Sequence, residues 1–170
     1  VASALQNLTN PTDPDGAIQI TSDPGDDKDP AFVSDDVVIY SHLADGATAY
    51  QLYTASVLAP HNPQPVFSAP TGCNDSEPAV NAADTDLVAF TRTCAAAASQ
   101  VYVVDRSLPV GPSNPRNITA ANGTAYPVTT DVEPDWAPNG SRLALVGTGT
   151  IFGGKSQLYS VLPDGSDRRP

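Results

Sequence analysis

The chain has 170 residues, of which 40% are hydrophobic and 16% are charged, and this composition fits one ordinary folded core rather than a highly charged disordered chain. Nineteen acidic against eight basic residues give a net charge of −11, which argues against binding to nucleic acid or to an anionic membrane surface, and no apolar run is long enough to span a bilayer. Seventeen prolines, twelve glycines and the lack of uninterrupted helical periodicity predict an all-β protein of short strands joined by turns.

The first predicted strand covers residues 17–22, within a segment 17–28 that is expected to supply the outer strand of a preceding blade or of the blade that closes the ring. The chain starts at Val1, contains no methionine and shows no basic region followed by an apolar stretch. These features leave three origins open: an exported protein whose signal has been removed, a fragment of a longer chain, or a cytosolic protein without its initiator methionine.

Two sequence markers recur three times along the rest of the chain and keep the same distance from each other. The first is an acid–proline pair and the second, 22 to 24 residues later, is a Gln-x-Tyr tripeptide. The pairs are Asp29-Pro30, Glu77-Pro78 and Glu133-Pro134, and the tripeptides begin at Gln51, Gln100 and Gln157. Two markers in step through three units indicate an internal repeat of about 50 residues.

Each repeat is predicted to contain four short antiparallel strands. A buried strand lies between the two markers and a closing strand follows the tripeptide. The buried strands are Asp36–Tyr40, Asp86–Phe90 and Arg142–Val146, and the closing strands are Gln64–Ser68, Arg116–Ala120 and the short end Arg168–Pro170. This length and content are those of one β-propeller blade, so blades are expected at residues 29–70, 71–131 and 132–170. In the third blade Asn139-Gly140 is expected to make a tight hairpin turn.

The only two cysteines, Cys73 and Cys94, flank the predicted hairpin of the second blade. A hairpin centred near residues 83 and 84 places them opposite each other, within the ~4.5–5.5 Å that a disulfide accepts. The bond predicts an oxidising compartment, either periplasmic or extracellular. Free cysteines acting as small apolar residues are the alternative, and the lack of a nearby histidine or Cys-x-x-Cys motif argues against a metal site.

The acids Asp29, Glu77 and Glu133 occupy equivalent positions just before the innermost strand of each blade. Innermost strands line the channel of a propeller, so the three carboxylates are expected to form an arc at one channel mouth. Such an arc could hold Ca²⁺ or receive a peptide that carries Lys or Arg, but the sequence predicts no cofactor. The alternative is that each carboxylate accepts backbone N–H groups from its own or a neighbouring blade.

Nothing in the sequence indicates a catalytic centre. There is no Gly-x-Ser-x-Gly elbow, and the only histidines, His42 and His61, are expected at the surface, one at the end of a strand and one in a turn. No catalytic residue is therefore predicted.

The third unit resembles the repeat of TolB-type β-propellers. Residues Glu133–Val146, followed by Gln157-Leu-Tyr and Asp164-Gly-Ser, match the family pattern E-P-x-W-S-P-D-G-x-x-I-A-F, L-Y-V and D-G-S. The first two units keep the acid–proline pair and both strands, but Phe32 and Val80 replace the tryptophan and the Pro-Asp-Gly turn is lost. The resemblance covers residues 17–170 and implies that Trp136 is buried between blades or against its own sheet.

The resemblance also implies a function and an incomplete ring. TolB-type proteins are periplasmic and bind other envelope proteins, which implies a non-catalytic scaffold for a protein or peptide. The alternatives are the propeller portion of a prolyl-oligopeptidase-like serine peptidase or a cation-dependent carbohydrate-active propeller. Such propellers have six or more blades, so three blades are expected to close a ring only with the remainder of a longer chain or by self-association.

Overall fold

The computed structural model describes residues 19–58, 61–95, 97–109, 114–120, 128–149 and 153–169. Within these ranges every regular element is a β-strand, which confirms the all-β prediction. No helix of the described residues could cross a membrane.

The strands form three antiparallel sheets, each a simple meander that follows the chain. Sheet 1 contains β1 (Gly25–Ser34), β2 (Val37–Ala44), β3 (Gln51–Ser56) and β4 (Gln64–Pro65). Sheet 2 contains β5 (Cys73–Val80), β6 (Leu87–Cys94), β7 (Gln100–Asp105) and β8 (Arg116–Asn117). Sheet 3 contains β9 (Val128–Trp136), β10 (Leu143–Gly149) and β11 (Ser156–Val161).

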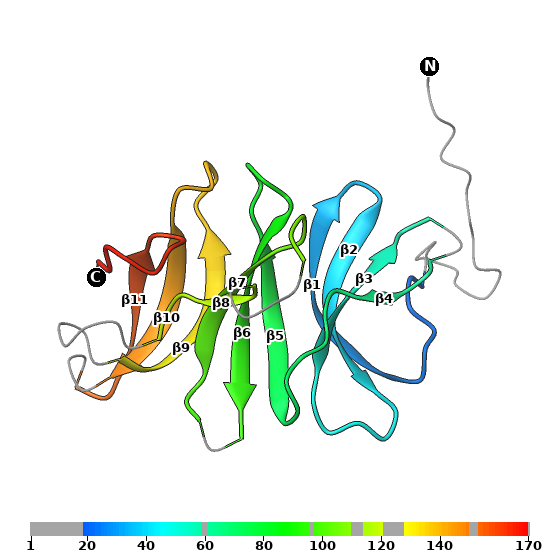
Figure 1. Ribbon diagram of the computed structural model, residues 1–170, viewed down its shortest axis with the longest axis horizontal. Helices are drawn as coiled ribbons and strands as arrows, with labels where there is room; N and C mark the ends of the chain where they lie inside the picture. The colour runs from blue at the N-terminus through cyan, green and yellow to red at the C-terminus, as the bar shows by residue number, and fades with distance from the viewer. Residues whose placement is uncertain are drawn as a thin grey trace.

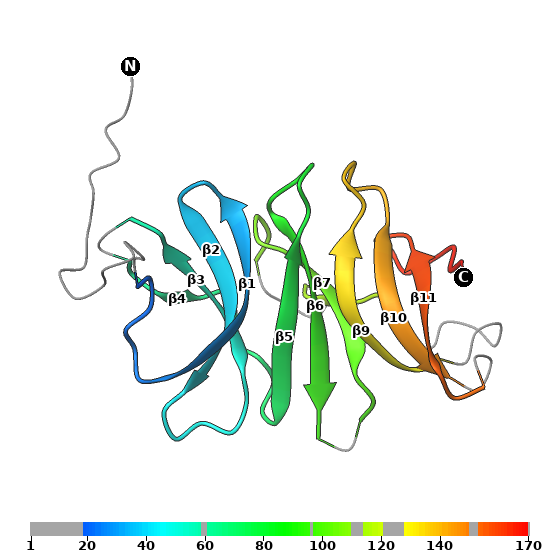
Figure 2. The ribbon, with the colours of Figure 1, turned by 180° about the vertical axis from the view of Figure 1, so that it is seen from behind.

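The three sheets stand side by side in chain order along the longest axis of the molecule (Figures 1 and 2). The first strand of each sheet contacts the first strand of the next, because β5 packs against both β1 and β9. Strands β1, β5 and β9 are therefore the inner edges of three successive blades.

Two apolar cores fill the spaces between neighbouring sheets. Strand β6 contributes side chains to both cores, because successive side chains of a strand point to opposite faces. Val88 and Phe90 point to sheet 1, whereas Ala89 points to sheet 3, and all three are 0% exposed. The core toward sheet 1 also contains Val33, Ile39, Leu52, Phe67 and Val104, and the core toward sheet 3 also contains Val101, Val103, Ile118, Trp136, Leu143, Leu145, Tyr159 and Val161. A central strand buried on both faces explains why the segment 87–90 is continuously apolar.

A bulge interrupts the innermost strand of each sheet at the acid–proline pair. Asp29, Glu77 and Glu133 have φ angles of 53°, 54° and 54°, in the left-handed region, and the register between the first two strands shifts across each pair. Proline has no N–H to contribute to the ladder, so a bulge is where a strand tolerates it.

The bulge in sheet 2 brings the two cysteines into register. Near the hairpin turn Val80 pairs with Val88. If this register continued unchanged along β5, Cys73 would lie one position out of register with Cys94. The extra residue on β5 moves the register by one, and Cys73 then pairs with Cys94. The predicted disulfide is confirmed. The prediction assumed one continuous register from the hairpin turn to the cysteines and did not include the bulge.

Several strand predictions need correction at their ends. The closing strands are only two residues long, at Gln64–Pro65 and Arg116–Asn117. In sheet 3 the described residues show a single bridge between Ser160 and Arg169 in place of a fourth strand, and Pro170 lies outside the described ranges. The described part of the predicted strand 17–22 is not a strand, and residues 17 and 18 lie outside the described ranges.

The third unit is also displaced by one residue relative to the predicted alignment. The tyrosine of each Gln-x-Tyr tripeptide lies opposite Tyr40, Phe90 and Leu145, so Leu145 rather than Val146 is the counterpart of Phe90. The Asn139-Gly140 turn is wider than a two-residue hairpin, because the strands it joins end at Trp136 and resume at Leu143. Only Gly140 of that pair has a positive φ, of 70°.

Candidate functional site

The three acids that precede proline are tied to one another through the backbone. Asp29 Oδ2 accepts a hydrogen bond from the Glu77 N–H at 3.3 Å, and Glu77 Oε2 accepts one from the Glu133 N–H at 2.9 Å. The Thr91 hydroxyl also donates to Glu77 Oε2 at 2.7 Å. Each of these two carboxylates thus accepts a hydrogen bond from the equivalent N–H group of the following sheet. This agrees with the alternative in which the acids bind backbone N–H groups of a neighbouring blade. A binding role for this arc stays a prediction.

The described residues offer no metal site at this arc. No group of three or more His, Cys, Asp or Glu side chains within the described ranges is placed to hold a metal ion. The calcium hypothesis therefore gains no support from the placement of Asp29, Glu77 and Glu133.

A second set of acids lies two residues before the first and is missing from the sequence-based prediction. Asp27, Asp75 and Asp131 stand in the repeated pattern Asp-x-acid-Pro, which is visible in the sequence. Asp75 is 0% exposed and Asp131 is 2% exposed. Their N–H groups donate to the carbonyls of Tyr50 and Ser99 in the preceding sheet, at 3.0 and 2.9 Å. The motif therefore supplies two backbone donors to each junction between sheets.

Each acid of this second set has its own side-chain partner. Asp75 accepts two hydrogen bonds from Arg92, from Nε at 2.6 Å and from Nη2 at 2.8 Å. Asp131 accepts the Tyr159 hydroxyl at 2.6 Å. Burial raises the pKa of Asp75 while Arg92 opposes the rise, and burial likewise raises the pKa of Asp131 against the hydrogen bond from Tyr159. Burial and the neighbouring Asp131 raise the pKa of Tyr159, which keeps its phenol neutral and donating.

The Arg92 guanidinium lies among three aromatic rings at the junction of sheets 1 and 2. Its carbon is 5.6 Å from the centroid of Phe67, 5.2 Å from that of Phe90 and 4.8 Å from that of Tyr102. The ion pair, with both carboxylate oxygens hydrogen-bonded, joins β5 and β6 of sheet 2, and the contact of the guanidinium with Phe67 links it to sheet 1.

His42 departs from the surface position that the sequence predicts. It is 6% exposed, its Nδ1 lies 2.7 Å from Asp27 Oδ1, and its ring packs 4.8 Å from that of Tyr53. The reason is its place in the repeat, because His42 lies opposite Asp27 as Arg92 lies opposite Asp75. His61 is half-buried, with Nδ1 2.9 Å from the Ser56 carbonyl oxygen.

Trp136 and Phe32 hold the same position in their sheets but have opposite surroundings. Trp136 is 7% exposed, packs in the core between sheets 2 and 3, and donates through Nε1 to the Ala79 carbonyl at 3.0 Å. Phe32 is 66% exposed, because the described chain has no sheet before sheet 1.

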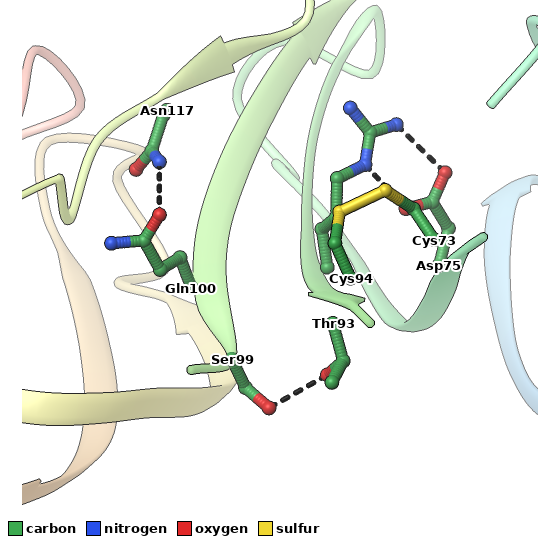
Figure 3. Close-up of a disulfide and its surroundings, with 8 residues drawn as sticks. Cys73, Asp75, Thr93, Cys94, Ser99, Gln100 and Asn117 are labelled. Carbon is green, nitrogen blue, oxygen red and sulfur yellow. Dashed lines mark hydrogen bonds and ion pairs between the residues drawn. A yellow bond between two sulfur atoms is a disulfide. The ribbon is translucent and has the colours of Figure 1, made fainter. Parts of the chain in front are cut away.

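A groove of about 460 Å³ crosses the boundary between sheets 1 and 2 beside the disulfide. Figure 3 shows the Cys73–Cys94 bond at the ends of β5 and β6, close to Asp75. The Tyr50 N–H donates to Asn74 Oδ1 at 2.8 Å and joins the two walls. The described lining is small and uncharged: Thr48, Ala49, Gly72, Asn74, Thr93, Cys94, Ala95 and Ala97.

Comparison with known proteins finds similarity of structure without similarity of sequence. No family model and no curated protein sequence matches the chain. TolB from Acinetobacter baumannii matches with a TM-score of 0.64 at 15% identity, over 91% of this chain and 34% of that one. Kuenenia stuttgartiensis hydrazine synthase matches with a TM-score of 0.66 at 13% identity, over 89% of this chain and 26% of that one.

A third solved structure, oligogalacturonate lyase from Vibrio parahaemolyticus, matches with a TM-score of 0.50 at 13% identity, over 82% of this chain and 35% of that one. The chain thus spans about a third or less of each of these proteins. At such identities the matches show the fold alone. The chain is a set of three propeller-type antiparallel sheets that corresponds to part of a larger β-structure.

Proposed function

We propose that this chain is a non-catalytic scaffold that binds a protein or peptide in the periplasm or outside the cell. The observation that carries the proposal is the groove between sheets 1 and 2. Its walls come from two sheets and are held by the Cys73–Cys94 bond and by the hydrogen bond from Tyr50 to Asn74. Its described lining offers amide and hydroxyl groups for hydrogen bonding and no acid or base for catalysis.

The disulfide also supports the proposed compartment. Disulfides persist in the periplasm and outside the cell and are rare in the cytosol. The excess of acidic residues favours a partner that carries Lys or Arg, and the carboxylates of the predicted arc are the natural contacts for such side chains.

Selection of random peptides displayed on phage against the immobilised protein provides the probe, and calorimetry then measures the affinity of a selected synthetic peptide. We expect Ala49→Trp, which fills the groove, to weaken binding at least about tenfold. Ser68→Trp, at an exposed position outside the groove, is the matched control.

The enzyme alternatives are tested on the same samples. Mass spectrometry of the peptide after incubation should show it unchanged, and cleavage would refute the non-catalytic assignment. Equal affinity for wild type and the Ala49→Trp variant would refute the groove as the binding site.

A further inference from the structure

The junction between sheets 1 and 2 and the junction between sheets 2 and 3 are built from the same contacts. In each, the acid of one sheet accepts the N–H of the acid in the next sheet, at 3.3 Å for Asp29 and Glu77 and at 2.9 Å for Glu77 and Glu133. In each, the third residue after the acid packs into the core shared with the preceding sheet, Val80 in one case and Trp136 in the other. Every sheet therefore presents a donor side to its predecessor and an acceptor side to its successor.

Sheet 3 exposes its acceptor side. We call this the exit face and define it by Glu133, Ala144, Val146 and Leu158. Leu158 holds the place of Val101 in the Gln-x-Tyr tripeptide, yet Leu158 is 73% exposed while Val101 is 0% exposed. Glu133 is exposed and its carboxylate accepts no hydrogen bond from any described residue.

The donor side of sheet 1 has no sheet packed against it among the described residues. We call this the entry face and define it by Asp29, Phe32, Val38 and Tyr40. Val38 and Tyr40 are only 6% and 3% exposed, because Ile20 packs against them. Phe32 is 66% exposed at the position where Trp136 is 7% exposed. Val38 and Tyr40, the counterparts of the core residues Leu143 and Leu145, line a mainly apolar cavity of about 160 Å³. Its other lining residues are Ile20, Thr21, Asp27, Lys28 and Pro30.

We propose that the exit face binds the entry face of a second copy of this chain, head to tail. The Asp29 N–H of one copy donates to Glu133 of the other, Phe32 packs over Ala144, and Leu158 enters the cavity beside Val38 and Tyr40. The occupant is a second copy because one chain carries both halves of a contact that it already forms twice within itself. A head-to-tail contact of this kind is heterologous, so it repeats around a ring or along a filament according to its rotation.

The association is tested by analytical ultracentrifugation of the whole 170-residue protein at micromolar concentration. The wild type should sediment as a multiple of 17.6 kDa. Phe32→Glu and Leu158→Glu should each raise the dissociation constant at least about tenfold, because each buries a charge in an apolar contact. Leu108→Glu, at a 55% exposed position in the turn after β7, is the control and should leave association unchanged.

Mixing the two variants tests the head-to-tail geometry. The Leu158→Glu chain keeps an intact entry face and the Phe32→Glu chain keeps an intact exit face, so the mixture should form a two-chain complex that neither variant forms alone. Trp136, the only tryptophan, lies between sheets 2 and 3, and its emission verifies folding independently of association.

The hydrogen bond is tested by a matched pair of charge removals. Glu133→Ala should weaken association, Glu133→Gln should retain it because an amide oxygen still accepts, and Asp135→Ala should have little effect. Equal effects of Glu133→Ala and Asp135→Ala would overturn the assigned hydrogen bond. A monomeric, folded wild type would refute the proposal that a second copy covers these faces. Further blades of a longer chain would then be the partner to test.

Discussion

At the residue scale, the chain places full charges inside its junctions. Asp75 and Arg92 are 0% and 6% exposed, and the cost of removing both from water is offset by two short hydrogen bonds and three surrounding rings. Such a pair contributes little net stability as a pair, but either member alone is a buried charge without compensation.

Asp75→Ala is therefore expected to lower the free energy of unfolding by about 3–5 kcal/mol. The matched control is Asp86→Ala, which breaks the exposed pair with Arg106 and should cost less than about 1 kcal/mol. Urea titration followed by Trp136 fluorescence measures both. Equal losses in the two variants would show that burial of the Asp75–Arg92 pair carries no energetic weight.

Tyr40 provides a pH-dependent prediction. Burial, with a smaller contribution from Asp27, raises its pKa to about 12, whereas an unfolded tyrosine titrates near 10. The folded state thus holds the proton more tightly, so stability is unaffected below pH 10 and falls as the pH rises from about 10 to about 12. The loss reaches about 3 kcal/mol from this group.

Absorbance of phenolate in an alkaline titration measures the effect. Tyr40→Phe should remove one late-titrating phenol and should reduce the loss of stability between pH 10 and 12. An unchanged titration curve in Tyr40→Phe would contradict the assignment.

At the scale of elements, the acid–proline bulge has two structural effects. It moves the register of β5 by one residue, which places Cys73 opposite Cys94, and it turns the N–H of the acid toward the preceding sheet. The same local device thus controls pairing within a sheet and contact between sheets.

The equivalent positions 136 and 32 should respond differently to truncation. Trp136→Ala is expected to lower the free energy of unfolding by about 3–5 kcal/mol, because it leaves a cavity in the core between sheets 2 and 3 and removes the hydrogen bond to Ala79. Phe32→Ala should cost less than about 1 kcal/mol when measured in the Leu158→Glu background, where the second copy is absent. Chemical denaturation of both variants in that background measures the difference, and equal costs would contradict it.

The disulfide joins β5 and β6 across 21 positions of sequence. In the chain-entropy model a loop of this length is worth about 3 kcal/mol. Reduction, or the double change of both cysteines to serine, should lower the free energy of unfolding by that amount. Intact mass after alkylation without reductant should show no modified thiol, and two modified thiols would refute the bond.

At the scale of the whole molecule, each sheet contacts only its neighbours, so stability is close to a sum of sheet and junction contributions. The two junctions have one core each, and the two outermost faces are those that the proposed second copy would cover. The excess of acidic residues acts on all of these contacts at once, because like charges repel within the fold and between copies.

Added salt should therefore raise the melting temperature. With a net charge of −11, screening by sodium chloride reduces self-repulsion, and we expect an increase of a few degrees between low salt and roughly physiological ionic strength. Calorimetry at fixed protein concentration measures the change. A lower melting temperature in salt would show that the ion pairs outweigh the repulsion.

The sequence by itself determined the features that local patterning records. Alternating and continuous apolar runs indicate which residues of a strand are buried, and the recurrence of Asp29-Pro30, Glu77-Pro78 and Glu133-Pro134 in step with the Gln-x-Tyr tripeptides shows how many units there are. The Cys73–Cys94 pairing also follows from position within one hairpin, because both strands are contiguous in the chain.

Only the tertiary structure decided the contacts that join distant segments. The packing of the Arg92 guanidinium against Phe67 and the acceptance of the Glu133 N–H by Glu77 depend on how neighbouring sheets pack, at separations of up to 56 residues. The left-handed bulge was hidden for the same reason. A non-glycine residue before proline shows no local preference for positive φ, and the acceptors of the Glu77 and Glu133 N–H groups lie in the preceding sheets.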